Sequence, residues 1–495
     1  MSAIEYANLD IGELTARTRA LVAANGRVRM AYAWYPEPNR IEVRYLTSCR
    51  AHEPFLVWKV RPDNMVMPSM ATEFPRLGWY EREMTDLFGL AFSGHPEPKR
   101  LVLHDGVEAP CPPMSPNYPA STRLEMTGHG SGMPELEGPD VQRLPWGPVR
   151  ADVVESAEFR FFYVGEHILH LHPQLFFKHR GMEKRFEGLT PEAGVVWAER
   201  VSGVGSFVHA LAYCQAVEVA SGCLVPERAR LLRVLLAELE RLYNHLHYLG
   251  HLADTTSLKV GAAEGKYLEE RAKQINSRLT GSRFLRSLLV PGGLRRELNP
   301  GTWLSAELGK LRNEITAYTS RLEETNSYLD RLITTGVLDK KVAYDQGATG
   351  PIERASGSDR DLRRDHPYAA YDRLPFKVAV REAGDAHARA QVRVEEIDAS
   401  IALILRVLPL LNAGEIRVPC HPPANGEGIG WAESPRGSLF YAVHFDDRGL
   451  CKRVKIKSPS FSNWRVFPFT VHDSNMMDYA INEASFGLTI AGCDR

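Results

Sequence analysis

The most constraining part of this sequence is residues 178–218, where a charge-dense segment leads through a polar loop into an apolar helix. Residues 178–184 read KHRGMEK, and the residues from Ser206 onward form an apolar run with helical character. Between these segments, Gly203 and Gly205 permit tight backbone turns, so we expect a loop that feeds the amino terminus of a helix. A polar loop held between apolar segments is a candidate functional site.

The composition is that of an ordinary globular protein. The chain has 495 residues, 44% of them hydrophobic, and a formal net charge of -1, which gives no indication of nucleic-acid binding. No apolar run approaches the roughly 18 residues that a membrane span needs. The best, residues 401–411, is interrupted by Arg406 and Pro409. We therefore expect any membrane association to come through partner subunits.

The cysteines and the amino terminus indicate a reducing compartment. The seven cysteines form no CxxC pair, which argues against a zinc ribbon, a ferredoxin-type cluster motif or a disulfide framework. Residues 1–17 contain acidic side chains and no apolar core, so we expect no signal peptide. A cytoplasmic location is the expectation.

Residues 199–207 carry a specific motif, ERVSGVGSF. It resembles the E-R-x-C-G-x-C-S-F motif in the large subunit of energy-converting (group 4, formate-hydrogenlyase-type) nickel-iron hydrogenases, which are related to the 49-kDa-type subunit of complex I. In the hydrogenases the two cysteines hold the metal. Ser202 and Gly205 stand in their places here.

The second ligand pair of the hydrogenases is also missing. Residues 485–495 read SFGLTIAGCDR and resemble the terminal D-P-C-x-x-C-T-D-R motif. Aligned on the closing Asp-Arg, the ligand positions fall on Thr489 and Gly492, with Cys493 one place beyond. Nickel and low-spin iron need soft thiolate ligands, so we expect this chain to bind neither a metal nor any other cofactor of its own.

A second motif lies near the end of the amino-terminal region. Residues 78–89 read GWYEREMTDLFG and are followed by GHP at 94–96. This resembles the W-x-E-R-E-x-x-D-x-F-G signature of the 30-kDa-type complex I subunit, which implies a docking and structural module without a cofactor. From spacing alone, the same charges would also fit a solvated helix face.

These observations predict an α+β chain of two domains joined by a linker. A 30-kDa-type α+β domain would cover residues 1–106, a linker rich in Pro, Gly, Ser and Thr residues 107–145, and a mainly helical, hydrogenase-large-subunit or 49-kDa-like domain residues 146–495. The expected strands are 28–35, 41–46, 158–163 and 167–171, with strand-like alternation over 438–469, and the expected helices are 226–249 (beginning at Pro226), 265–289, 303–334 and 386–411.

A quinone site is the alternative to a metal. In the 49-kDa relatives, a histidine in a G-P-x-H-P turn and a tyrosine donate to the quinone, and here Arg150 and Trp197 occupy those positions. Arginine keeps its proton near neutral pH and the indole N–H does not titrate, so ordinary quinone reduction is not expected. Alternatively, Arg150 pairs with Asp152 or Glu155, and Trp197 fills the space of the missing ligand.

Much of the surrounding framework is retained. By resemblance, Glu183 in RGMEK begins the proton path of the hydrogenases, Arg436 in ESPRG lies over the iron, and Asp254 matches an acid that orients the quinone histidine of complex I. Buried charges are costly unless they are paired. Arg180, Glu183, Arg200 and Arg436 would therefore form a satisfied ion network, or Glu183 would act as a proton-relay or coupling residue.

Three functional hypotheses follow from this resemblance. In the first, the chain is an oxidoreductase subunit that passes electrons from the Fe–S cluster of a neighbouring subunit to an acceptor other than protons at a nickel site, in a cavity near Arg150, Glu183, Trp197 and Arg436. In the second, it is a non-catalytic scaffold or coupling subunit. In the third, it reduces quinone through rearranged donors such as Tyr163.

The resemblance also implies a membrane complex. The expected partners are a small, hydrogenase-type Fe–S subunit, a ferredoxin-like subunit and antiporter-like membrane subunits, without nucleic acid. The chain would then lie peripherally on the inner face of the cell membrane.

Overall fold

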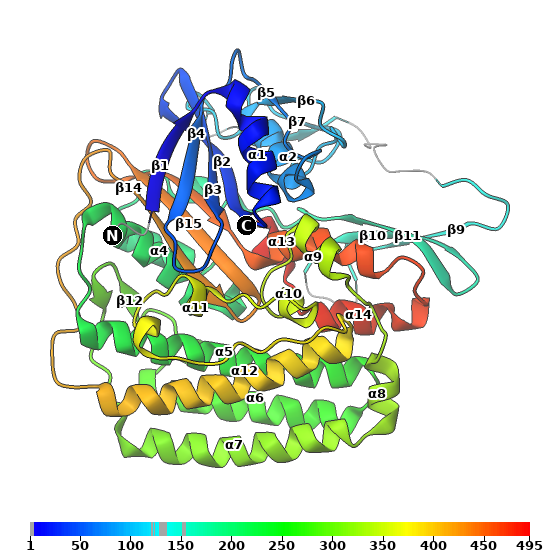
Figure 1. Cartoon of the computed structure of the whole chain (residues 1–495), viewed down its shortest axis with the longest axis vertical. Coiled ribbons are helices and arrows are strands. Elements are labelled where there is room, and N and C mark those ends of the chain that lie inside the picture. Colours follow the sequence, from blue (N-terminus) through cyan, green and yellow to red (C-terminus); the bar gives the residue numbers. More distant parts are fainter. Residues whose placement is uncertain (1–3, 120–121, 123, 128–135, 151–154) are drawn as a thin grey trace.

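The computed structural model describes residues 4–119, 122, 124–127, 136–150 and 155–495. The chain has the mixed α+β structure that the sequence predicts. Its amino-terminal domain stands on a mainly helical body, and an arm built from strands projects from the junction between them (Figure 1).

A four-stranded sheet in the order β1-β4-β3-β2 forms the centre of the amino-terminal domain. β1 runs parallel to β4, and the other neighbours are antiparallel. Tyr45 and Leu46 of β3 are both buried but belong to different apolar clusters, so both faces of the sheet are covered. The elements are β1 Ile4–Leu9, α1 Leu14–Ala23, β2 Arg27–Glu37, β3 Arg40–Ser48, β4 Phe55–Val60 and α2 Gly78–Phe88.

The carboxy-terminal sheet packs against this domain. It consists of β14 Glu427–Ser434, β15 Gly437–Phe445 and β16 Cys451–Lys457, all antiparallel. The ring of Trp34 stacks on His444 at 3.9 Å between centroids, and Arg44 pairs with Glu427 at 2.6 Å. Apolar residues of the two sheets also share a cluster, because Leu46 and Val57 belong to the same one as Phe440.

The 30-kDa-type motif forms α2, and its acids face inward. Glu81 is fully buried and accepts hydrogen bonds from the Ser69 hydroxyl (2.5 Å) and the Met70 amide (2.7 Å). Asp86 accepts three backbone hydrogen bonds from residues 101–103. The solvated-face interpretation is wrong for this helix, because its carboxylates organise the loops around it.

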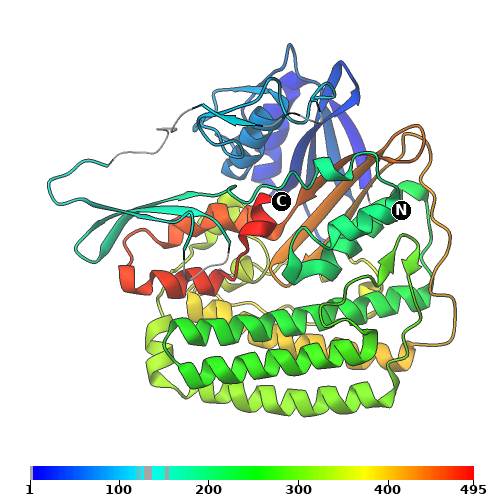
Figure 2. The ribbon, with the colours of Figure 1, turned by 180° about the vertical axis from the view of Figure 1, so that it is seen from behind.

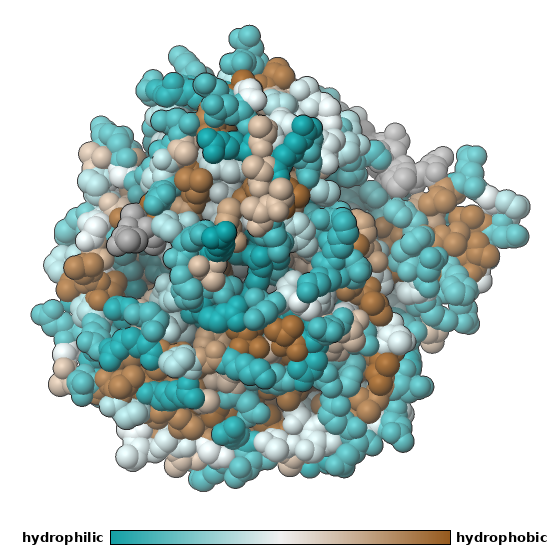
Figure 3. Space-filling model, in the orientation of Figure 1, coloured by the Kyte–Doolittle hydropathy of each residue, from teal (hydrophilic) through white to brown (hydrophobic). Residues whose placement is uncertain are grey.

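Strands also occur within the predicted linker. β7 Val107–Glu108 pairs with β8 Glu125–Met126, and β9 Gln142–Trp146 pairs with β10. β10 Glu158–Val164 and β11 His167–Gln174 confirm the two predicted strands and complete the projecting arm. The arm exposes Leu144 and Val164, and apolar side chains are visible on it in Figure 3. A further pair, β5 Val66–Pro68 and β6 Ala91–Ser93, is parallel.

The helical body is a layered bundle. α5 packs on α6 and α12, and α6 packs on α7, which gives the stack seen from behind in Figure 2. The leucines of α5 are buried, as their helical spacing predicts. In the described ranges, no helix combines the length and apolar character that crossing a bilayer requires. The helices are α3 Pro191–Ala198, α4 Ser206–Ser221, α5 Glu227–Thr255, α6 Lys259–Thr280, α7 Gly301–Glu323, α8 Asn326–Leu332, α9 Lys340–Gln346, α10 Pro351–Ala355, α11 Leu362–Asp365, α12 Ala386–Val407, α13 Pro459–Val466, α14 Tyr479–Phe486 and α15 Ile490–Asp494, with a small hairpin of β12 Leu289–Val290 and β13 Gly293–Leu294.

Two glycines allow α4 to lie directly on β14. A Cβ atom at Gly428 would stand 2.0 Å from the carbonyl oxygen of Ala216, and one at Gly430 would stand 2.1 Å from that of Ala212. Any side chain at these strand positions would push the helix away. The glycines thus fix the position of α4, whose first turn carries the candidate site.

Several predicted boundaries are shifted, each by a local signal. Pro226 is the residue before α5 rather than its first helical residue. The predicted helix over 303–334 is divided at Thr325 into α7 and α8, and that over 386–411 ends at Val407, before Pro409. The strand-like alternation over 438–469 ends at Lys457, because the Ser458 hydroxyl caps α13 by accepting from the Phe461 amide.

Candidate functional site

The first pair of lost ligand positions lies at the start of α4. Ser202 is buried, and its carbonyl accepts from the Gly205 amide at 3.1 Å. The first amides of a helix have no intrahelical acceptor. Glu240 of α5 supplies one by accepting from Phe207 (2.7 Å) and Val208 (3.0 Å). Burial nevertheless raises the pKa of Glu240 to about 8.

The second pair lies at the start of α15. The hydroxyl of Thr489 accepts from the Gly492 amide at 3.2 Å and so caps this short helix. Glu155 adds a carboxylate, which accepts from the amides of Ile490 (2.6 Å) and Ala491 (3.1 Å). These oxygen atoms accept hydrogen bonds from the first backbone amides of α15, so they are not free to act as metal ligands.

Arg180 connects the two loops. Its guanidinium donates to the carbonyl oxygens of Arg200 (3.0 Å) and Val201 (2.6 Å) in the first loop and to that of Ala491 (3.3 Å) in the second. Its backbone amide also donates to the carbonyl of Arg495 at 2.9 Å. The Arg180 guanidinium therefore joins the residue before Ser202 to the residue before Gly492.

Arg436 makes a second connection. Its Nε donates to the carbonyl of Gly487 and its Nη1 to the side-chain oxygen of Asn244, both at 2.8 Å. Asn244 in turn donates to the carbonyl of Val204 at 2.8 Å. Burial lowers the pKa of Arg436 to about 10, well above neutral, so the guanidinium stays charged.

A buried histidine–tyrosine pair lies beside these arginines. His209 Nδ1 is 2.8 Å from the hydroxyl of Tyr441. Burial, with the charges of Arg180 and Arg436 adding to it, lowers the pKa of His209 to about 3. Neither residue of the pair was predicted from the sequence. The signal that could have found them is the position of His209 one turn into α4, directly after the motif.

These residues do not fit a nickel-iron centre. The four ligand positions offer no thiolate, and the thiol of Cys493, next to Gly492, is fully buried in the apolar cluster that includes Trp464. Burial raises the pKa of Cys493 well above its usual value, which disfavours the thiolate that a metal needs. Among the described residues, no group of three or more His, Cys, Asp or Glu side chains is arranged to hold a metal ion.

Glu183 is buried among cations. It accepts from Arg453 (2.7 Å) and Arg495 (3.2 Å), lies 3.2 Å from Lys455, and accepts from the Ile456 amide at 3.1 Å. Burial by itself would raise the pKa of this carboxyl, but Lys455, Arg453 and Arg495 together hold it well below its usual range. The ion network predicted around Glu183 exists, but its cations are not Arg180, Arg200 or Arg436.

Arg150 pairs with a distant carboxylate. It contacts Glu483 of α14 at 3.0 Å, and its guanidinium lies over the rings of Trp146 (4.6 Å) and Phe159 (4.9 Å). The expected partner Glu155 instead binds α15 and Lys178, and Asp152 lies outside the described residues. The contact with Glu483 arises because the chain folds α14 against the arm.

The comparisons with known proteins agree with this architecture. Residues 15–123 match the family "Respiratory-chain NADH dehydrogenase, 30 Kd subunit", residues 267–423 and 419–495 match the 49 Kd subunit of the same enzyme, and residues 180–281 match "Nickel-dependent hydrogenase". Formate hydrogenlyase subunit 5 of Escherichia coli is 32% identical over 83% of this chain and 74% of its own length. The chain belongs to this family of fused 30- and 49-kDa-type subunits.

Other members of the family give the same picture. Hydrogenase-4 component G of Escherichia coli is 31% identical over 85% of this chain and 74% of its own length. The C/D-type fusion protein of the NADH-quinone oxidoreductase of Rhodopseudomonas palustris is 28% identical over 80% of this chain and 76% of its own. A solved chain of the membrane-bound sulfane sulfur reductase, an archaeal respiratory membrane complex, superposes with a TM-score of 0.68 at 26% identity, covering 72% of this chain and 99% of that one.

Two further candidate residues of this family member are Trp197 and Asp254. Trp197 of α3 is half-buried, with the guanidinium of Arg185 over its ring at 5.3 Å. Asp254, at the end of α5, pairs with the exposed lysines Lys259 (2.6 Å) and Lys266 (3.3 Å). Of the five candidate residues, Arg436 reaches the terminal segment at Gly487 and Glu183 reaches it at Arg495.

Proposed function

We propose that this chain is a metal-free coupling subunit of a membrane-associated, complex-I-like respiratory complex. The observation that carries the proposal is the Arg180 guanidinium, which donates to carbonyls of both loops that in the hydrogenases present the metal ligands. A fixed cation at this position links the loops mechanically and offers no electron-transfer chemistry of its own. Movement of one loop is therefore transmitted to the other.

The distribution of the retained charges supports coupling over a redox role. Glu183 lies with Arg453, Lys455 and Arg495, and the last two also contact Glu83 of the amino-terminal domain. The side chain of Arg150 contacts Glu483, that of Trp197 contacts Arg185, and that of Asp254 contacts two surface lysines. An acceptor site assembled from the predicted residues would require them to converge, whereas a network that spans the domain boundary suits the transmission of a conformational change.

The partners and the location belong to this proposal. The named relatives are subunits of hydrogenase, NADH-quinone oxidoreductase and respiratory membrane complexes. By analogy, this chain would bind a small Fe–S subunit, a ferredoxin-like subunit and antiporter-like membrane subunits, on the inner face of the cell membrane. The projecting arm, with exposed Leu144 and Val164, provides an apolar surface for such contacts.

Vesicles that contain the native assembly test the proposal. We would measure electron transfer and ion translocation together in the Arg436→Lys variant, with Arg200→Lys as the control. Arg200 is exposed, and its side chain donates to a carbonyl of its own segment, that of Val196. If the chain couples the two processes, the Arg436→Lys variant will move fewer ions per electron while its rate of electron transfer stays unchanged. A fall in both, with an unchanged ratio, would contradict it.

His209 and Tyr441 favour a second candidate, a terminal reduction site. A neutral imidazole and a phenol can supply a proton, and Arg180 and Arg436 nearby would attract an anionic acceptor. The archaeal relative is named for sulfane sulfur, so polysulfide is the acceptor to test. Polysulfide-dependent oxidation of the assembly that is lost in Tyr441→Phe would favour this candidate.

The quinone hypothesis receives less support. Tyr163 lies four residues along β10 from Phe159, the residue against Arg150, which separates the two by about 13 Å along the strand. One quinone headgroup would not bridge them.

A further inference from the structure

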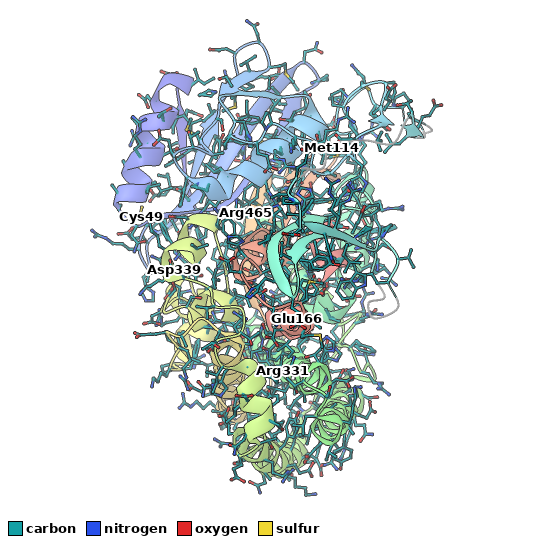
Figure 4. The ribbon with its side chains drawn as sticks, turned by 90° about the vertical axis from the view of Figure 1, so that its right-hand side faces the viewer. Cys49, Met114, Glu166, Arg331, Asp339 and Arg465 are labelled. Carbon is teal, nitrogen blue, oxygen red and sulfur yellow. The ribbon has the colours of Figure 1, made fainter. Side chains whose placement is uncertain are left out.

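A small cavity between the two domains is lined by an excess of positive charge. Its volume is about 20 Å³, on the scale of one or two water molecules. β2 and the start of α2 contribute one wall, and the carboxy-terminal sheet and α13 contribute the other. Five basic residues line it, namely Arg27, Arg29, Arg76, Lys457 and Arg465, and no carboxylate does. Figure 4 labels Arg465, which lies where the amino-terminal domain meets the rest of the chain.

Only one of these cations forms a direct ion pair in the described part of the chain. Arg27 pairs with Glu353 at 2.5 Å. Arg29 donates to the Ser48 hydroxyl (2.8 Å), Lys457 to the Ser438 carbonyl (2.8 Å) and hydroxyl, and Arg465 to the Pro75 carbonyl (3.0 Å).

The fourth, Arg76, donates to the carbonyl of Tyr344 and lies over the rings of Phe74 (4.1 Å) and Tyr344 (4.8 Å). Neutral oxygens and aromatic faces offset only part of a buried charge.

Unused donors remain at the cavity wall. Arg27 Nε and Nη1, Arg76 Nε and Arg465 Nε are buried nitrogen atoms that have no hydrogen-bond acceptor among the described residues, and each of these side chains is at least nine-tenths buried. Guanidinium groups keep their proton at all physiological pH values, so the charge cannot be relieved by deprotonation. A buried lysine can lose its proton, and burial, with Arg29 adding to it, lowers the pKa of Lys457 to about 7.

We propose that this cavity binds one small inorganic anion of halide size, chloride in the cell, and that the anion holds the two domains together. The volume excludes a nucleotide or a carboxylate metabolite. A water molecule would fit but would leave the charge uncompensated. Arg27, Arg29 and Arg76 come from the amino-terminal domain, and Lys457 and Arg465 from the carboxy-terminal part, so a single anion would bridge both.

Halide titration of the purified chain tests this inference. We would follow thermal unfolding in sodium bromide and in sodium gluconate of equal ionic strength, since gluconate is too large for the cavity, and locate bromide by anomalous diffraction. We expect a bromide-specific rise in Tm and an anomalous peak between Arg27 and Arg465. If the protein is folded and shows neither the rise in Tm nor the anomalous peak, the inference is overturned.

Two variants keep the test decisive. Arg29→Gln removes a half-buried charge, but the glutamine side chain can still donate a hydrogen bond to Ser48. Lys457→Met removes the ammonium group. Each should weaken bromide binding about tenfold or more, the loss expected for one charge-assisted hydrogen bond. Arg40 is a partly exposed cation in the same sheet, and the Arg40→Gln variant should bind bromide as the wild type does. Equal weakening in all three variants would instead indicate non-specific screening and contradict the site.

Discussion

The carboxylate of Glu83, on α2 of the amino-terminal domain, accepts two hydrogen bonds from the ammonium of Lys455 on β16, at 2.7 and 2.8 Å. Both side chains are buried, and Arg495 donates to the same carboxylate at 3.0 Å. The 30-kDa-type motif thus docks onto the second domain through a buried ion pair. Lys455 also lies 3.2 Å from Glu183, so the docking contact is continuous with the Glu183 network.

Loss of the docking carboxylate should destabilise the whole chain. Removing one partner of a buried ion pair typically costs about 3–5 kcal/mol, because the remaining charges stay buried. We therefore expect Glu83→Gln to lower the free energy of unfolding by that amount in urea titrations. Glu5→Gln, at an exposed position of β1, should change it by less than about 0.5 kcal/mol. Equal effects of the two substitutions would contradict the docking role.

Glu183 should make stability depend on acid pH. Its pKa in the folded protein is lower than the 4.5 of the free side chain, so its stabilising contribution is complete above about pH 4.5 and is lost as the pH falls through the folded value. Glu183→Gln should lower the free energy of unfolding by about 3–5 kcal/mol at pH 7. The difference in this free energy between the variant and the wild type should become smaller below pH 4.5.

Urea unfolding between pH 7 and pH 3 measures this difference in the free energy of unfolding. Glu187→Gln, which removes a partly exposed partner of Lys184, is the control and should show a small difference at every pH. A Glu183→Gln difference that stays constant down to pH 3 would mean that the carboxylate is not stabilised by its cations.

The contact of α4 with β14 should not tolerate a methyl group. In Gly430→Ala, the new Cβ would stand 2.1 Å from the Ala212 carbonyl, so we expect a loss of about 1–3 kcal/mol as the helix is displaced. Gly309→Ala is the matched control, because no atom lies within 4 Å of its Cβ in α7, and alanine there should stabilise by about 0.5–1 kcal/mol. Thermal unfolding of the two variants should shift in opposite directions.

Arg180 should keep the two loops ordered together. Lysine retains the charge but cannot fork to three carbonyls, so Arg180→Lys should speed amide hydrogen exchange in residues 201–205 and 489–492 at the same time. Arg200→Lys should leave both segments unchanged. Faster exchange in only one segment would show that Arg180 does not couple them.

The sequence predicted the architecture well because its signals are local. The leucine spacing on α5, the alternation in β10 and β11, and the motifs at Glu183, Ser202 and Thr489 each depend on neighbouring residues. The alternating glycines of β14 are also a local sign of a close backbone approach.

The long-range pairings could not be predicted in this way. Glu83 and Lys455 are 372 positions apart, and Arg150 meets Glu483 333 positions away. No periodicity specifies which of many acids a buried cation will meet. His209 and Tyr441 come together only because α4 packs on the sheet that contains β15.

The most direct measurement is the reoxidation of reduced Fe–S clusters in the purified native assembly, followed by electron paramagnetic resonance. Short-chain quinone and polysulfide would be added separately to the wild type and to Arg436→Lys and Tyr441→Phe. If this chain couples and does not transfer electrons, the reoxidation rates will be the same in all three proteins. A rate that falls in either variant, with the assembly intact, would place an electron acceptor at the joined loops and contradict the coupling role.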